Sequence, residues 1–131
     1  MIPSPGALLK QANIADTVIL APFAIPGLSE LYVSLWAWLD KALFGGNSLT
    51  SLNPTAFVFV YLSGAFALLA VYVRSRHSDT RTARMVGLFK VIVAGIFAFA
   101  VVYGAAKIFL IPMAADLLVG SLLLVSAHRA P

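Results

Sequence analysis

The sequence predicts an all-α integral membrane protein: a bundle of four transmembrane helices whose first helix is kinked or broken near Pro22–Gly27. Of its 131 residues, 61% are hydrophobic and 11% are charged, whereas about a quarter of the residues of a soluble domain are charged. The apolar residues form long blocks, and several reach the roughly 20 residues that a helix needs to cross a bilayer. We therefore expect a single transmembrane domain over residues 1–131. The expected spans are residues 14–43, 54–73, 85–106 and 109–127.

The first apolar block, residues 14–43, is too long for one upright span at about 1.5 Å per residue. It contains two prolines and a glycine between residues 22 and 27, and a proline inside a helix removes a backbone donor and clashes with the preceding turn. We expect a break there within one kinked span. The alternative makes residues 28–43 an amphipathic helix on the membrane surface. Three spans would then remain, and the two termini would face opposite sides.

The leader before this block, residues 1–13, has mixed polarity, and we expect it at the membrane surface. Lys10 and the apolar run 17–25 imitate a signal peptide, but Asp16 beside the run and Pro22 within it argue against cleavage.

The later spans follow from continuous apolar runs. Pro54 suits the first position of a helix, where its missing N–H costs nothing, and residues 54–73 after it carry no charge. The apolar character of residues 85–127 extends over about 65 Å of helix, which is more than one crossing. We expect this stretch to fold back on itself within residues 104–112, giving two helices joined by a tight turn.

The distribution of basic residues predicts the orientation. The loop at residues 74–84 holds four arginines, whereas Lys41 and Lys107 are isolated cations beside the other two turns. Loops rich in lysine and arginine stay in the cytoplasm. We therefore expect a multi-pass protein of the cell inner membrane with this loop and both the N- and the C-terminus in the cytoplasm.

Several kinds of chemistry are excluded or disfavoured by the residue types. The chain has no cysteine, which excludes disulfides and thiolate metal sites. His77 and His128 lie outside the spans, so neither suits a haem within the bundle, and no other metal site or catalytic residue is expected. The net charge of +4 sits beside apolar blocks, where it indicates topology and not nucleic-acid binding. A quinone or a lipid is the only bound small molecule that we consider.

Asp116 is the most informative position because it lies inside the fourth apolar block. A charge within a span costs a few kcal/mol, so this carboxylate should face the bundle or a water-filled cavity. It could bind a proton or a ligand there. The structural alternative is a hydrogen bond to Tyr103 or Ser63, or a pairing with Lys107.

Glu30 is the second candidate carboxylate, expected at a depth similar to that of Asp116. Two carboxylates that met would raise each other's pKa, and both could share Lys107. The structural alternative is that Ser29 caps a half-helix after the break and that Glu30 stabilises its positive end. The candidate ligand-binding residues are Glu30, Tyr103, Lys107 and Asp116.

Lys90 lies in the first turns of the third span. Its long stem could reach toward the cytoplasmic interface. Asp16 is expected at a similar level, so an ion pair between Asp16 and Lys90 is the alternative.

Small residues predict where helices approach each other. Ser63 and Gly64 lie mid-span in the second block, Gly95 has small neighbours in the third, and Gly120 shares a face with Asp116 in the fourth. Small residues allow close helix packing in lipid.

The overall layout resembles the DoxX-like group of small bacterial four-helix membrane proteins. The resemblance covers residues 14–127 and rests on the proline-interrupted first segment, the basic loop at residues 74–84 and the closing sequence Pro112-Met-Ala-Ala-Asp-Leu-Leu-Val-Gly. It implies association with membrane redox partners and quinone-linked oxidation, often as an accessory subunit. No catalytic residue is transferred by it.

From the scarcity of reactive groups we expect a non-enzymatic accessory or anchoring subunit of a membrane complex, and the resemblance implies that this complex is redox-linked. Its partners would be membrane lipids and other membrane subunits or further copies of itself, and not nucleic acid. The alternative is a small-molecule or proton-coupled carrier that uses the intramembrane carboxylates. An enzyme in its own right ranks third and would need a quinone-type pocket.

Overall fold

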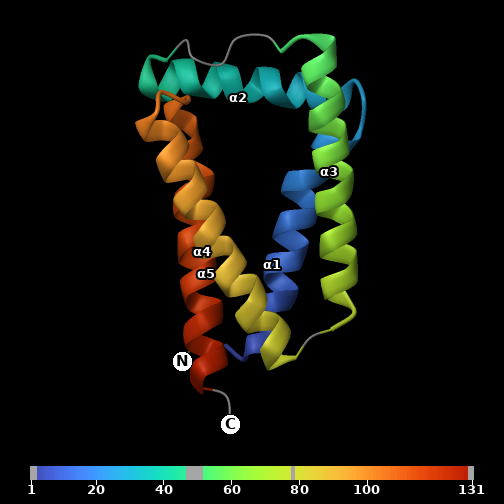
Figure 1. The fold of residues 1–131 in the computed structure, drawn as a ribbon, viewed down its shortest axis with the longest axis vertical. Coiled ribbons are helices and arrows are strands. Elements are labelled where there is room, and N and C mark those ends of the chain that lie inside the picture. Colours follow the sequence, from blue (N-terminus) through green and yellow to red (C-terminus); the bar gives the residue numbers. More distant parts are fainter. Residues whose placement is uncertain (1–2, 47–51, 78, 130–131) are drawn as a thin grey trace.

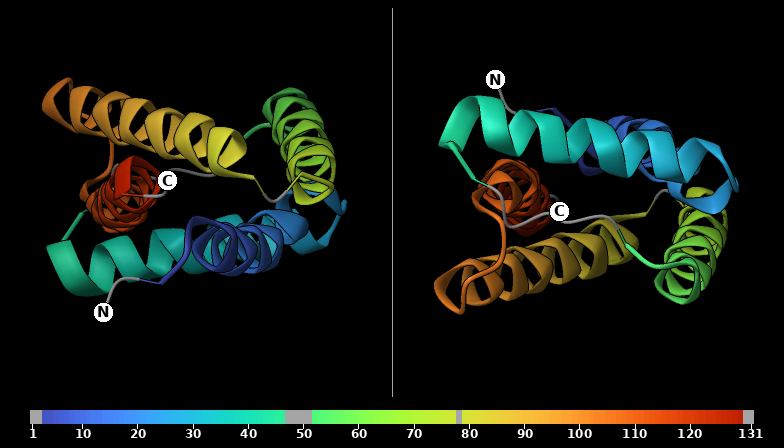
Figure 2. Two further views of the ribbon diagram at one scale, coloured as in Figure 1. Left: turned by 90° about the horizontal axis from the view of Figure 1, so that it is seen from below. Right: turned by 90° about the horizontal axis from the view of Figure 1, so that it is seen from above.

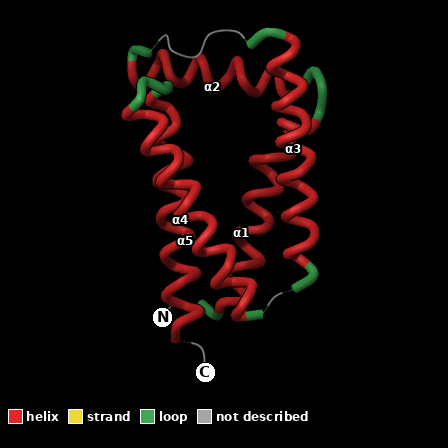
Figure 3. The backbone as a smooth tube through the Cα atoms, viewed as in Figure 1, coloured by secondary structure: helices red, strands yellow, loops and turns green. Residues whose placement is uncertain are grey.

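The computed structural model describes residues 3–46, 52–77 and 79–129, and these residues form helices and connecting turns without a strand (Figures 1 and 3). Three helical stretches are long and apolar enough to cross a membrane: α3, α4, and α5 with the short helix before it. The all-α prediction is confirmed, and the composition of these helices supports a membrane protein. The elements are α1 (Pro5–Leu20), the 3-10 helix η1 (Ala21–Ala24), α2 (Leu28–Phe44), α3 (Pro54–Ser75), α4 (Thr80–Val102), the 3-10 helix η2 (Lys107–Phe109) and α5 (Leu110–Arg129).

Four of the five α-helices run along the length of the molecule, and α2 lies across one end of it (Figure 1). Helix α4 packs along α5, while α1 contacts α3, α4 and α5. Helices α1 and α4 begin, and α3 and α5 end, at the end opposite α2 (Figure 1). We call this the basic end, because the following cations lie on or next to these helix ends: Lys10, Arg74, Arg76, Arg81, Arg84 and Arg129.

The first helix begins earlier than the sequence suggested. Ser4 caps it by accepting a hydrogen bond from the Ala7 N–H at 3.4 Å, and a proline occupies its first turn. Leu9 is fully buried against α4 and α5, in a cluster that includes Ala83 and Leu123. The described part of the predicted leader, residues 3–13, thus belongs mostly to a packed helix, and its place at the membrane surface stays a prediction. The polar residues of this helix lower its average hydrophobicity, and one of them, Asn13, is itself buried on the same face as Leu9.

The chain breaks where the prolines predicted it would. The axis turns by 110° between Pro5–Ala24 and Leu28–Phe44. Gly27 takes a φ of +84° at the N-cap of α2, a conformation that a residue with a Cβ rarely adopts. The predicted cap at Ser29 is wrong, because the N-cap is Gly27 and Ser29 is the second residue of the helix, where its hydroxyl donates to the Glu30 carboxylate.

The direction of α2 differs from that of a mildly kinked span. With a bend of 110°, residues 14–43 do not form one upright rod, and α2 instead crosses the molecule beside the far ends of the long helices (Figure 2). This geometry is that of the alternative surface helix. A fourth span exists only if the bent pair is counted as one, so the four-span bundle is not confirmed.

The hairpin of the last two helices agrees closely with its prediction. Helix α4 ends at Val102 and α5 begins at Leu110, so the chain turns within the expected region. Gly104 takes a φ of +98° in this turn, which suits a residue without a Cβ. Pro112 lies in the first turn of α5, where it leaves no helical hydrogen bond unmade.

Two glycines bring α4 and α5 together. A Cβ on Gly87 would lie 2.9 Å from the Gly120 carbonyl oxygen, and one on Gly120 would lie 2.8 Å from the Gly87 carbonyl oxygen. The prediction for Gly120 is thus correct. The expected contact at Gly95 is wrong, because a Cβ there would meet open space. Gly64 packs as expected of a contact glycine, since its Cβ would lie 2.5 Å from the Ala24 nitrogen of η1.

Candidate functional site

The candidate site is a group of polar side chains that joins α1, α3, α4 and α5. At its centre the Lys90 ammonium Nζ lies 2.9 Å from Asp16 Oδ1 and 2.7 Å from Asp116 Oδ1. One lysine on α4 therefore pairs with a carboxylate on α1 and with another on α5. The three residues are far apart in the sequence, so only the packing of the helices brings them together.

Arg74 extends the group to α3. Its Nη2 donates to Asp16 Oδ2, and its Nε donates to Asn13 Oδ1 at 2.6 Å. Asp16 thus uses one oxygen for each of two cations. We call Asn13, Asp16, Arg74, Lys90 and Asp116 the charge network.

The members of the charge network are largely shielded. The side chains of Arg74, Asp16, Lys90 and Asp116 are 16%, 15%, 9% and 21% exposed. Two cations face two carboxylates, so the ionised network is neutral as a whole. Within an apolar body such pairing offsets the cost of removing the charges from water, and loss of one member would leave another uncompensated.

The close approach of α4 and α5 positions the lysine. A Cβ on Gly120 would lie 3.1 Å from the Lys90 Cβ, so the lysine stem passes over the space that the glycine leaves. Asp116 precedes Gly120 by four residues and therefore lies on the same face of α5. The Lys90 stem crosses α5 at Gly120, and its ammonium reaches the Asp116 carboxylate one helical turn away.

The contacts of the charge network decide between the roles predicted for Lys90 and Asp116. The predicted ion pair between Asp16 and Lys90 is confirmed. Lys90 does not extend to the interface, because it is buried between two carboxylates. Asp116 faces the bundle as expected, but its partner is Lys90 and not Tyr103, Ser63 or Lys107.

Glu30 lies outside the charge network, at the start of α2. One carboxylate oxygen accepts the Gly27 N–H at 2.7 Å and the Ser29 hydroxyl at 2.9 Å, and the other accepts the Tyr61 hydroxyl of α3. The interpretation of Glu30 as the residue that stabilises the start of the half-helix is confirmed. The hydrogen bond with Tyr61 also fixes the start of α2 to α3.

The four predicted ligand-binding residues are not gathered in one place. Tyr103 is 76% exposed and Lys107 is also exposed. No described hydrogen bond or ion pair joins any two of Glu30, Tyr103, Lys107 and Asp116. A ligand-binding role for these residues stays a prediction.

Two polar residues of structural importance were missed. Arg74 was taken for a loop residue, although it directly continues the uncharged run that ends at Val73 and so shares its helix. Asp40 is 1% exposed, and its Oδ1 accepts the Ile108 N–H at 2.9 Å. It thereby ties the end of α2 to η2. No local pattern marks Asp40, because its partner is a backbone group from a distant turn.

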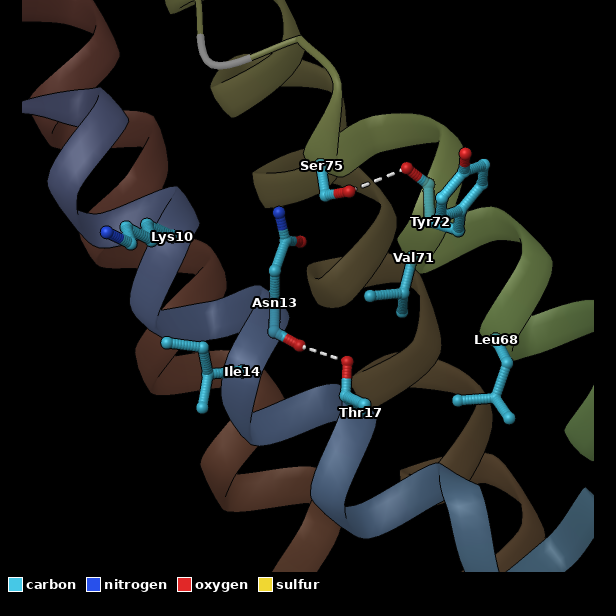
Figure 4. A pocket seen from close by; sticks show the side chains of 8 residues that line it. All are labelled: Lys10, Asn13, Ile14, Thr17, Leu68, Val71, Tyr72 and Ser75. Carbon is cyan, nitrogen blue, oxygen red and sulfur yellow. Dashed lines mark hydrogen bonds between the residues drawn. The ribbon is translucent and has the colours of Figure 1, made fainter.

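A groove of about 610 Å³ runs between α1 and α3 beside the charge network (Figure 4). Each helix contributes residues at positions i, i+3, i+4 and i+7, which form one stripe along its face. Asn13 belongs to both the groove and the network. The lining residues are Lys10, Asn13, Ile14 and Thr17 from α1 and Leu68, Val71, Tyr72 and Ser75 from α3.

Comparison of this chain with protein-family models, with curated proteins and with solved structures found no match. The charge network and the groove therefore have to be interpreted from their own geometry.

Proposed function

We propose that this chain is a small multi-pass membrane protein that serves as an accessory or anchoring subunit of a membrane complex. The charge network carries the proposal. Its two cations and two carboxylates pair with one another, so they brace the four long helices against one another. A braced apolar scaffold suits a subunit whose task is to hold a partner in place.

The outward faces of the long helices supply surfaces for such a partner. Phe59 and Phe66 of α3 are 67% and 68% exposed, and Phe89 and Phe99 of α4 are 61% and 62% exposed. In a membrane, faces of this kind contact lipid tails or the spans of other subunits through close packing.

The resemblance to DoxX-like proteins narrows the proposed partner to a membrane redox protein, linked to quinone oxidation. Purification in mild detergent after photocrosslinking from position 66 or 89 tests the proposal. We expect a defined crosslinked subunit or a second copy of this chain. A lone monomer without any crosslinked or co-purifying protein would contradict it.

We also propose that the basic end faces the cytoplasm of a cell with an inner membrane. The positive-inside rule supports this orientation, because the arginine-rich turn and both ends of the described chain share one end of the molecule (Figure 1). The chain has no cysteine, so single-cysteine variants label cleanly. An impermeant maleimide should label Lys41→Cys in intact cells and His77→Cys only in permeabilised cells. The reverse pattern would invert the orientation.

The second candidate is a small-molecule or proton-coupled carrier. The observation that favours it is the sharing of Lys90 by Asp16 and Asp116 at 2.9 and 2.7 Å, because protonation of either carboxylate would free the lysine for the other. Asp116→Asn should then abolish proton-coupled uptake into vesicles. Unchanged uptake would reject this candidate and leave the anchoring proposal intact.

A further inference from the structure

The groove between α1 and α3 has a polar end and an apolar end. The two helices run in opposite directions (Figure 1), so Lys10 on α1 and Tyr72 and Ser75 on α3 lie toward the basic end. Leu68 lies seven residues before Ser75, which places it about 10 Å deeper at the rise of an α-helix. Ile14 and Val71 line the groove between these levels.

Positive charge is concentrated at the polar end. Lys10 is exposed and has no carboxylate partner in the described part of the chain. Arg76 follows directly after the groove residue Ser75, and its guanidinium lies 4.9 Å from the centre of the Tyr72 ring. It also donates to the Tyr72 hydroxyl. This contact holds a second cation beside the groove residue Tyr72.

On the side of the groove that borders the charge network, the charged group already has partners. Arg74 is bound to Asp16 and Asn13, whereas Lys10 and Arg76 have no carboxylate partner among the described residues. The interior offers aliphatic side chains and the Thr17 hydroxyl, which donates to the Asn13 carbonyl oxygen at 2.8 Å. A ligand that fits must therefore be anionic at one end and apolar over the following 10 Å or so.

From this polarity we infer that the groove binds one anionic phospholipid, with its phosphate at Lys10 and Arg76 and an acyl chain along Ile14, Val71 and Leu68. Basic pockets between transmembrane helices recognise anionic headgroups in this way. The volume of about 610 Å³ is within the range of small-molecule sites. The inference goes beyond the proposed function and applies equally to an anchoring subunit and to a carrier.

Native mass spectrometry of the full chain from mild detergent, with added phosphatidylglycerol or phosphatidylcholine of the same acyl chains, tests the inference. The wild type should retain more phosphatidylglycerol than phosphatidylcholine. The Lys10→Gln/Arg76→Gln variant should lose about fivefold in affinity for each cation removed, because a cation near the headgroups contributes about 1 kcal/mol. Lys41→Gln, which removes an exposed cation of α2, is the control and should leave the preference unchanged.

A second variant tests the apolar part of the site. Ile14 is 58% exposed, so Ile14→Trp should fold, as circular dichroism will check, and should fill the groove. We expect it to reduce retention of both lipids. Unchanged phosphatidylglycerol preference in the double variant, an equal loss in Lys41→Gln, or unchanged retention in Ile14→Trp would each overturn the inference.

Discussion

Lys90 shows how one side chain can hold a membrane domain together. Its ammonium pairs with carboxylates from two other helices, and one of these carboxylates also pairs with Arg74. In an apolar body, removal of one member of such a network costs about 3–5 kcal/mol, because the partner keeps an uncompensated charge. The effect of a substitution should therefore depend on which charge remains.

Lys90→Met should destabilise the protein by about 3–5 kcal/mol, measured as a shift in unfolding by a denaturing detergent. Asp116 then has no cationic partner in the charge network, whereas Asp16 keeps Arg74. Lys90→Met/Asp116→Asn should therefore lose less stability than the single variant. The matched control is Lys107→Met, at an exposed lysine. Equal stability of Lys90→Met and the wild type would show that the network does not brace the fold.

Individual residues also show which contacts the sequence does not predict. Asp116 was correctly expected to face the bundle, because a charge in an apolar run must do so. Its partner was not identified, since Lys90 was expected to reach the interface and only the close passage of α4 over Gly120 brings the two together. Arg74 was missed for a related reason. It continues an apolar helix but was grouped with the basic loop.

At the scale of the helices, the effect of replacing a glycine in α4 depends on whether another helix packs against that glycine. Gly87 and Gly95 lie on the same helix, yet a Cβ on Gly87 would lie 2.9 Å from a backbone oxygen and one on Gly95 would meet nothing within 4 Å. The same substitution therefore has opposite consequences at the two positions.

Gly87→Ala should destabilise the hairpin by about 1–3 kcal/mol, because α5 must move away. Gly95→Ala should be neutral or stabilise the helix by up to about 1 kcal/mol, the difference in helix propensity. Thermal unfolding of both variants in one detergent makes the comparison. Equal effects would mean that α4 and α5 do not touch at Gly87.

The start of α4 is stabilised by Asp79, whose carboxylate accepts the Thr82 N–H at 2.6 Å. This hydrogen bond holds the pKa of Asp79 below its usual value of 3.8. A lowered pKa in the folded state means that the stabilisation is present above the unfolded pKa and is lost as the pH falls through the folded one.

Asp79→Ala should therefore lower the Tm slightly at pH 7, and the difference from the wild type should shrink in acid, below the lowered pKa of the carboxylate. Asp79→Asn keeps a capping oxygen and should show little pH dependence of this difference. Circular dichroism melts across this range provide the measurement. A difference that persists unchanged in acid would exclude the capping role.

Prediction of the elements succeeded where the signal is local. The uncharged run after Pro54 became α3, and the turn between α4 and α5 falls at Gly104, as expected. The first half of α1 was missed because its polar residues conceal a narrow buried face at Leu9. The break at Pro22–Gly27 was predicted, but the size of the bend depends on contacts of α2 with distant elements, such as Asp40 with Ile108.

At the scale of the whole molecule, the direction of α2 decides how the protein sits in a bilayer. The 110° bend lays α2 across the ends of the long helices, where a surface helix would follow the membrane interface. The chain has two tryptophans, Trp36 and Trp38, both in α2. They therefore report the position of this helix alone.

Single-tryptophan variants should report equal depths along α2. Trp38 with Trp36→Phe gives one probe, and Leu31→Trp in a background without the native tryptophans gives the other. Both positions are exposed, at 63% and 70%. Lipids brominated at different depths should quench both equally, near the interface. If α2 were upright, seven residues would separate the probes by about 10 Å in depth, and their quenching profiles would differ.

The position of Asp16 has a consequence for biosynthesis. Helix α1 is translated before α3 and α4, yet it carries a carboxylate whose counter-charges, Arg74 and Lys90, lie on these two later helices. A segment with an unmatched acid partitions poorly into lipid. Nascent chains truncated before Arg74 should therefore insert α1 inefficiently in a glycosylation-site assay, and chains that include Arg74 and Lys90 should recover insertion. A helix synthesised before its partners would thus settle in the membrane only after they have arrived.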